Sequence, residues 1–180
     1  LLHPGFQLRQ HAHVEAARFY ARALEVARSA PDPAPAEVAS LQESLADAWF
    51  RAGEFRKASD AYAEARKIVT GGKLAEARLL LKLSWVEEKL GNYPEALKWT
   101  ERAREALEGQ QGLDVERLMA STTAWYATVL QAQGRSDEAL QWAERATREA
   151  EDVDDPEELG NAYGVMAWAT GALGKEGAEA

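Results

Sequence analysis

The sequence predicts an all-α protein, an α–α superhelix of stacked antiparallel helix pairs. Its 180 residues are dominated by alanine, leucine, glutamate and arginine, which favour helices, and only six are proline. Hydrophobic residues make up 46% of the chain, so a packed core can form. A pattern of glycine and alanine also recurs along the chain, which is typical of repeat architectures.

The recurring pattern is Gly-x4-Ala-x6-Ala, and it begins at Gly53, Gly91 and Gly134. A large side chain stands eight residues before each glycine and a small one stands seven before. Glycine accepts a left-handed backbone, so we expect each of these glycines to end one helix and open the turn into its antiparallel partner. Small residues where the two helices cross allow their backbones to approach closely.

Incomplete copies flank the three complete ones. His11, Ala16 and Ala23 keep the spacing with histidine in place of glycine, and Gly174 is followed by Glu179 where alanine is expected. Within a single domain over 1–180, we expect a partial repeat at 1–30, full repeats at 36–70, 74–108 and 114–151, and a truncated repeat at 156–180. Incomplete repeats expose apolar faces, so we expect either a longer parent protein or association of the ends.

Eight helices are expected, each bounded by a recognisable signal. Their predicted ranges are 6–29, 35–52, 54–69, 73–90, 94–108, 114–133, 136–151 and 156–173. A proline-rich linker, 29–35, follows the first helix, and Gly71-Gly72 precedes the fourth. Pro94 suits the first turn of the fifth helix, Asp114 can cap the sixth, and Asp155-Pro156 provides a cap and a first-turn proline for the eighth.

The order of large, small, glycine and alanine positions resembles the tetratricopeptide repeat over nearly the whole chain. The resemblance implies a right-handed solenoid that binds extended peptides or partner helices in its concave groove. The anchor glycines are 38 and 43 residues apart, and Gly174 follows after 40 more. These spacings exceed the roughly 34 residues of the standard repeat, so longer helices or loops are expected.

Several kinds of chemistry are disfavoured by composition. There is no cysteine, and the three histidines, His3, His11 and His13, do not share a helical face suited to a metal. Gly71-Gly72-Lys73 lacks the upstream glycine and strand of a phosphate-binding loop. No catalytic grouping or cofactor motif is legible, so we expect no enzyme activity and no cofactor. A net charge of −9 disfavours nucleic acid and anionic membranes as partners.

The resemblance directs attention to side chains expected in the groove. Trp85 and Trp168 each lie six residues before an anchor glycine, a position that faces the concave surface in tetratricopeptide arrays. Arg78, Lys82 and Lys89 share one face of a helix beside Trp85, which favours an acidic protein or peptide as partner. The remaining expected contact residues are Phe50, Arg51 and Trp125.

Two other functions remain open at this stage. The incomplete terminal repeats are compatible with a self-association module that forms a homo-oligomer, and a pocket between helices is compatible with sensing a small ligand. The segment 83–97 also resembles repeat regions that follow an ATPase module in large bacterial signalling proteins. That resemblance implies a cytoplasmic regulatory or sensor arm of a larger protein.

Overall fold

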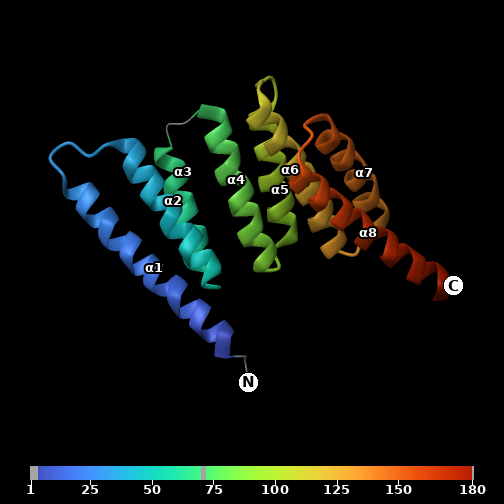
Figure 1. The fold of residues 1–180 in the computed structure, drawn as a ribbon, viewed down its shortest axis with the longest axis horizontal. Coiled ribbons are helices and arrows are strands. Elements are labelled where there is room, and N and C mark those ends of the chain that lie inside the picture. The colour runs from blue at the N-terminus through green and yellow to red at the C-terminus, as the bar shows by residue number, and fades with distance from the viewer. Residues whose placement is uncertain (1–3, 70–71, 180) are drawn as a thin grey trace. The chain divides into compact units, whose positions relative to one another are not determined.

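A computed structural model of the chain describes residues 4–69 and 72–179, and no strand occurs in these two ranges. The helices follow one another as antiparallel neighbours within each half of the chain (Figure 1). They are α1 Pro4–Ser29, α2 Pro35–Arg51, α3 Phe55–Ile68, α4 Gly72–Lys89, α5 Tyr93–Leu107, α6 Leu113–Ala132, α7 Ser136–Asp152 and α8 Pro156–Glu179. The all-α prediction is confirmed.

The contacts within the chain divide it into two compact units, Leu1–Leu90 and Gly91–Ala180. The first contains α1 to α4 and the second contains α5 to α8, and each is described by itself. The division falls at the turn between α4 and α5, in the middle of a predicted repeat. The expected single domain over 1–180, with its five repeat segments, stays a prediction.

In the first unit, α1 packs on α2, α2 on α3 and α3 on α4. Gly53 forms the turn between α2 and α3 with φ +78°, the left-handed conformation expected from the repeat pattern. The amide of Gly53 donates to the carbonyl of Phe50 at 3.0 Å, which satisfies a carbonyl at the end of α2. Ala58 and Ala65 on α3 are fully buried, so the backbones of the paired helices lie close together.

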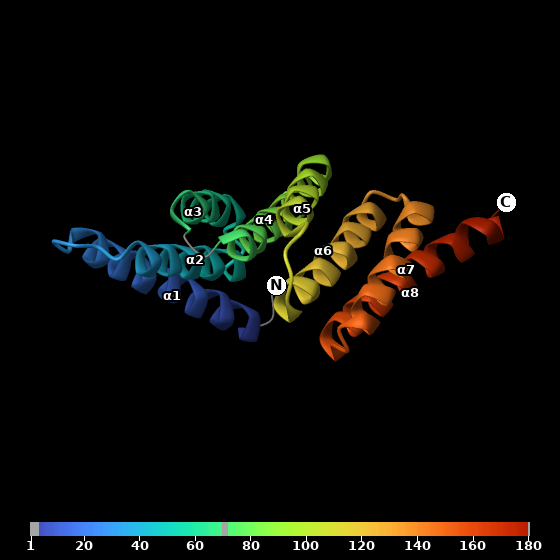
Figure 2. The same ribbon diagram turned by 90° about the horizontal axis from the view of Figure 1, so that it is seen from above.

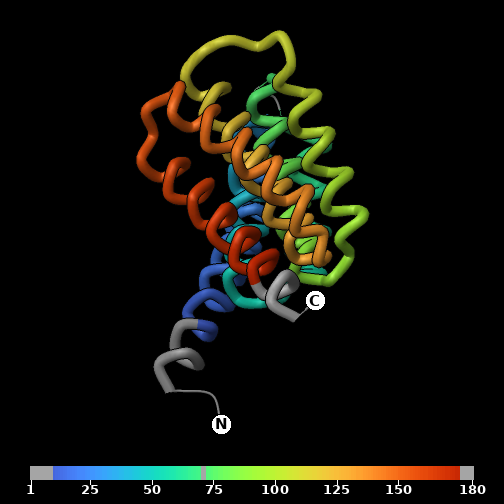
Figure 3. Tube along the Cα trace, turned by 90° about the vertical axis from the view of Figure 1, so that its right-hand side faces the viewer, coloured from blue at the N-terminus to red at the C-terminus, as the bar shows by residue number. Residues whose placement is uncertain are grey.

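In the second unit, α5 packs on α6, α6 on α7, and α8 on both α6 and α7. Figures 2 and 3 show α7 and α8 side by side. Leu97, Val129 and Leu130 form the apolar centre of this packing, together with the buried repeat alanine Ala139. Large side chains therefore fill the space beside small ones, as the repeat pattern predicts.

The start of α8 has the cap that the sequence predicts. Asp155 Oδ1 accepts hydrogen bonds from the amides of Glu157 at 2.9 Å and Glu158 at 3.3 Å. Arg117 on α6 also pairs with Asp155 at 2.9 Å. One carboxylate thus caps α8 and ties its first turn to α6.

The predicted boundaries agree with the structure within two residues, except at the end of α8. The expected end at 173 is wrong, because α8 continues through Gly174 to Glu179. Gly174 does not have the positive φ of Gly53, Gly91 and Gly134. Gly174 therefore lies in helical backbone and continues α8 instead of ending it.

Candidate functional site

A pocket of about 210 Å³ opens on the first unit among α2, α3 and α4. Three of its lining residues lie on α2, one on α3 and two on α4. They are Asp47, Phe50, Arg51, Tyr62, Lys82 and Trp85. The structure therefore brings together four predicted contact residues, Phe50, Arg51, Lys82 and Trp85, whose role in binding stays a prediction.

Aromatic rings form the apolar wall of this pocket. The rings of Phe50 and Trp85 lie 6.4 Å apart with their planes inclined by 45°, so the side chains of α2 and α4 meet directly. Phe55, at the start of α3, packs edge-on against Phe50 at 5.6 Å. Both Phe50 and Trp85 are only partly buried, which leaves aromatic surface available to a partner.

A compact group of charges centred on Lys82 also lines the pocket. Its ammonium lies 2.7 Å from Glu43 Oε1 and 2.7 Å from Asp47 Oδ1, and its side chain is only 13% exposed. The hydroxyl of Tyr62 donates to Asp47 at 2.6 Å. Burial raises the pKa of Tyr62 above its ordinary value, and the bond to Asp47 raises it further, so Tyr62 stays a neutral donor.

This arrangement changes the expectation of a uniform basic stripe. Arg78 and Lys89 are exposed on α4, and neither of them lines the pocket. Lys89 pairs with Glu88 at 3.0 Å. Lys82 lies between two carboxylates that the chain itself provides, so its charge is already compensated. Arg51 is the exposed cation of the pocket lining.

The other two predicted contact residues belong to the second unit. Trp125 on α6 is partly buried and packs against the core that contains Leu97 and Leu130, so part of its ring serves packing. Trp168 on α8 is 51% exposed. Neither of these tryptophans lines the pocket of the first unit, and their part in binding a partner stays a prediction.

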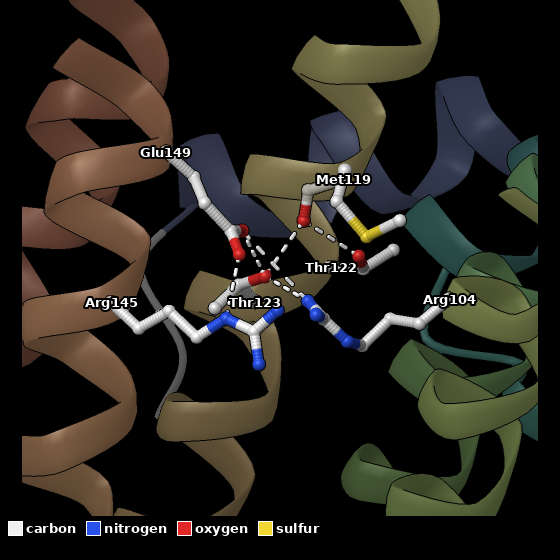
Figure 4. A network of polar contacts seen from close by, with 6 residues as sticks. All are labelled: Arg104, Met119, Thr122, Thr123, Arg145 and Glu149. Atoms are coloured by element: carbon white, nitrogen blue, oxygen red, sulfur yellow. Dashed lines mark hydrogen bonds and ion pairs between the residues drawn. The ribbon is translucent and has the colours of Figure 1, made fainter. Parts of the chain in front are cut away.

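A polar network in the second unit was not anticipated from the sequence (Figure 4). Glu149 on α7 accepts hydrogen bonds from Thr123 on α6 and from Arg145 Nε at 2.7 Å, and Arg104 on α5 lies 3.8 Å away. Arg104 also donates to Thr123. Three helices are thereby joined through one carboxylate. The repeat pattern gave no signal of it, because neither Glu149 nor Thr123 has an equivalent in the other repeats.

Trp142 on α7 completes this network. The guanidinium groups of Arg104 and Arg145 each lie 5.3 Å from the centre of its ring, which is cation–π geometry. Burial lowers the pKa of Arg104 from its ordinary value, and the nearby Glu149 opposes that shift. Since these groups satisfy one another, we assign the network to stability of the second unit rather than to ligand binding.

A larger hollow of about 440 Å³ lies between the end of α3 and the start of α4. Arg66, Val69, Gly72, Lys73 and Glu76 line it. Lys73 and Glu76 pair with each other at 3.0 Å. Among the described residues of its lining there is no aromatic ring, and Val69 is the one large apolar side chain, unlike ordinary small-molecule pockets.

Metal and membrane functions gain no support from the parts of the chain that the structure describes. In residues 4–69 and 72–179, no three His, Cys, Asp or Glu side chains are placed to hold a metal ion. Among the same residues, no helix has both the length and the apolarity needed to cross a membrane.

The fold is that of a helical-repeat protein with an aromatic-lined pocket on its first unit. A family model described as Tetratricopeptide repeat matches residues 37–109, which span α2 to α5. This match confirms, over these residues, the resemblance to the tetratricopeptide repeat that the sequence shows. Repeats of this family generally serve as scaffolds for protein interactions, and the match supports such a role for the matched residues.

Two solved structures share the fold. BtubC (BKLC) from P. vanneervenii is 22% identical with a TM-score of 0.76, and the match covers 94% of this chain and 70% of that one. The N-terminal domain of stress-induced protein-1 (STI-1) from C. elegans is 20% identical with a TM-score of 0.56, over 74% of this chain and 98% of that one. A search of curated proteins finds no match. At these identities the likeness shows the fold alone.

Proposed function

We propose that the chain binds an extended segment of a partner protein across α2 and α4, with one apolar side chain of the partner inserted beside Phe50 and Trp85. The aromatic wall that these two residues form in the 210 Å³ pocket is the observation that supports this proposal. The volume lies below the roughly 300–1,000 Å³ of ordinary small-molecule sites, so it suits one side chain better than a whole ligand.

The preference for an acidic partner is assigned to Arg51 in this proposal. Lys82 already contacts Glu43 and Asp47, so it has little attraction left for an incoming carboxylate. Arg51 is exposed in the same lining and can form a two-pronged contact with a carboxylate. The partner segment would thus carry an apolar residue with an acidic residue close to it.

The test uses peptides selected on the native chain from a random-sequence display library. Their affinity is then measured by calorimetry for the native chain and for Trp85→Ala. Loss of a central aromatic contact is expected to weaken binding by about tenfold or more. Arg51→Glu is expected to weaken only the peptides that contain acidic residues.

Trp49→Ala is the matched control. Trp49 is partly buried like Trp85, but it lies on α2 and does not line the pocket. It is expected to bind the peptides normally. Equal affinity of the native chain and Trp85→Ala would refute the proposed site. Loss of binding in Trp168→Ala instead would move the site to α8.

We also propose that the chain is a cytoplasmic regulatory arm of a larger bacterial signalling protein. The support is the resemblance of residues 83–97 to repeat regions that follow ATPase modules, together with the interaction role of the repeats. Sequencing the gene on both sides of the segment that encodes the chain tests whether the chain is part of a larger protein. An adjoining ATPase module is expected, and stop and start signals directly at the ends of the chain would contradict it.

A further inference from the structure

A second pocket of about 210 Å³ lies between α2 and α4, beyond the charged group around Lys82. Among the residues that the structure describes, its lining is aliphatic apart from Ser40 and Glu43. The aliphatic members are Ala36, Ala39, Val69, Ala75 and Leu79. This is the aliphatic pocket, as distinct from the aromatic pocket that contains Phe50 and Trp85. The function proposed above uses the aromatic pocket alone.

The two pockets lie end to end along one face of α2. Its lining residues follow one another at steps of three or four positions, which places them on the same side of the helix. They include Ala36, Ser40 and Glu43 in the aliphatic pocket and Asp47 and Arg51 in the aromatic pocket. Ala36, Ser40 and Arg51 are exposed, so both pockets open along the same edge of α2.

The lining residues of α4 show the same arrangement. Ala75 and Leu79 belong to the aliphatic pocket, and Lys82 and Trp85 follow at steps of three in the aromatic pocket. The two pockets are therefore parts of one groove between α2 and α4.

The charged group around Lys82 forms the boundary between the two pockets. Lys82 lines the aromatic pocket, and its ammonium lies 2.7 Å from Oε1 of Glu43, which lines the aliphatic pocket. The side chains of Glu43 and Asp47 are 28% and 27% exposed, whereas that of Lys82 is 13% exposed. Two carboxylates and one ammonium leave one net negative charge, and the carboxylates are the more exposed members. The boundary therefore attracts a cation.

The separation of the pockets matches the spacing of side chains in an extended chain. The lining residues are centred roughly ten positions apart on α2 and six or seven on α4, which is about 10–15 Å along a helix. Four residues of extended chain cover about 13 Å, and side chains two and four positions apart project to the same face. A segment that lies along the groove can therefore place one side chain in each pocket and the side chain midway between them over the carboxylates.

We propose that the partner segment has two apolar residues four positions apart with a basic residue midway between them. One apolar side chain enters the aromatic pocket, the other enters the aliphatic pocket, and the basic side chain meets Glu43 and Asp47. The inference rests on the proposed function and deepens it, because it names two further side chains of the partner. The lining of the aliphatic pocket suits a branched aliphatic residue, and the acidic residue that contacts Arg51 lies beyond the first apolar one.

Peptides selected on the native chain from a random-sequence display library test the pattern. The selected sequences are expected to share two apolar residues four positions apart, with lysine or arginine midway. Replacing the apolar residue of the aliphatic pocket with serine is expected to weaken binding about tenfold in calorimetry. Replacing the basic residue with glutamine is expected to weaken it several-fold. Both measurements use the native chain, so they do not depend on the folding of a variant.

Two variants of the chain locate these contacts. Ala36→Phe fills the aliphatic pocket from its exposed edge and is expected to weaken the selected peptides about tenfold. Combined with the serine-substituted peptide, it should cost no more than either change alone, because both remove the same contact. Glu43→Gln is expected to weaken peptides that keep the basic residue more than peptides in which glutamine replaces it.

Ala12→Phe is the matched control, since it adds the same ring at an exposed position of α1 outside both pockets. It is expected to bind the peptides normally, and circular dichroism checks that each variant is folded.

The outcomes separate this inference from the function on which it rests. Peptides that require Trp85 but bind Ala36→Phe as tightly as the native chain would overturn the inference and leave the proposed function standing. The same holds for selected peptides whose apolar residues lie seven positions apart, which is the spacing of a helical partner. If Trp85→Ala binds like the native chain, or the library yields no binding peptide, the proposed function fails and the inference fails with it.

Discussion

At the scale of single residues, Lys82 shows how a side chain that looks available in the sequence is engaged in the structure. Glu43 and Asp47 lie 39 and 35 residues away from it in the chain and meet it through the packing of α4 near α2. With all three side chains less than a third exposed, the group acts as a structural link that holds one wall of the pocket.

Replacing Lys82 with methionine is expected to lower the free energy of unfolding by about 1–3 kcal/mol, because it leaves two neighbouring carboxylates without their cation. The double variant Lys82→Met/Asp47→Asn should recover part of this loss, since one of the repelling charges is gone. Urea unfolding measures both. Lys98→Met is the control, because Lys98 forms only an exposed pair with Glu95 and should change stability by less than about 0.5 kcal/mol. A Lys82 variant as stable as the native chain would contradict the structural role.

At the scale of elements, each helix begins and ends for a local reason, and the caps differ in strength. α8 starts with a side-chain cap from Asp155 that is also paired with Arg117. α2 and α5 start with a proline in the first turn and without a side-chain cap bond.

Asp155→Ala is therefore expected to destabilise the chain by about 1 kcal/mol or somewhat more, since it removes the cap and the ion pair together. Asp155→Asn keeps a capping oxygen but loses the charge, so it should retain most of the stability. Thermal unfolding followed by circular dichroism compares the two variants. If Asp155→Asn were as damaging as Asp155→Ala, the pair with Arg117 rather than the cap would be the main contribution.

At the scale of the whole molecule, the stacking of neighbouring repeats determines how much apolar surface each helix buries. Each helix buries only part of its apolar surface against its neighbours, so the first and last helices keep an open face unless another helix covers it. The burial of the repeat alanines inside each unit, compared with Ala16 and Ala167, shows where those faces are.

The sequence by itself predicted the helices and the tetratricopeptide resemblance. Glycine turns, alanine crossings and caps act over a few residues, so they recur in the sequence at regular spacing. Gly53, Ala58 and Asp155 behave as their local sequence predicts. The tertiary structure alone decided which charges are available, since the partners of Lys82 and Arg104 come from other helices at distances in the chain that no repeat pattern encodes. It also decided that α8 continues through Gly174, since a glycine can stay in helical backbone as well as adopt the positive φ of a turn.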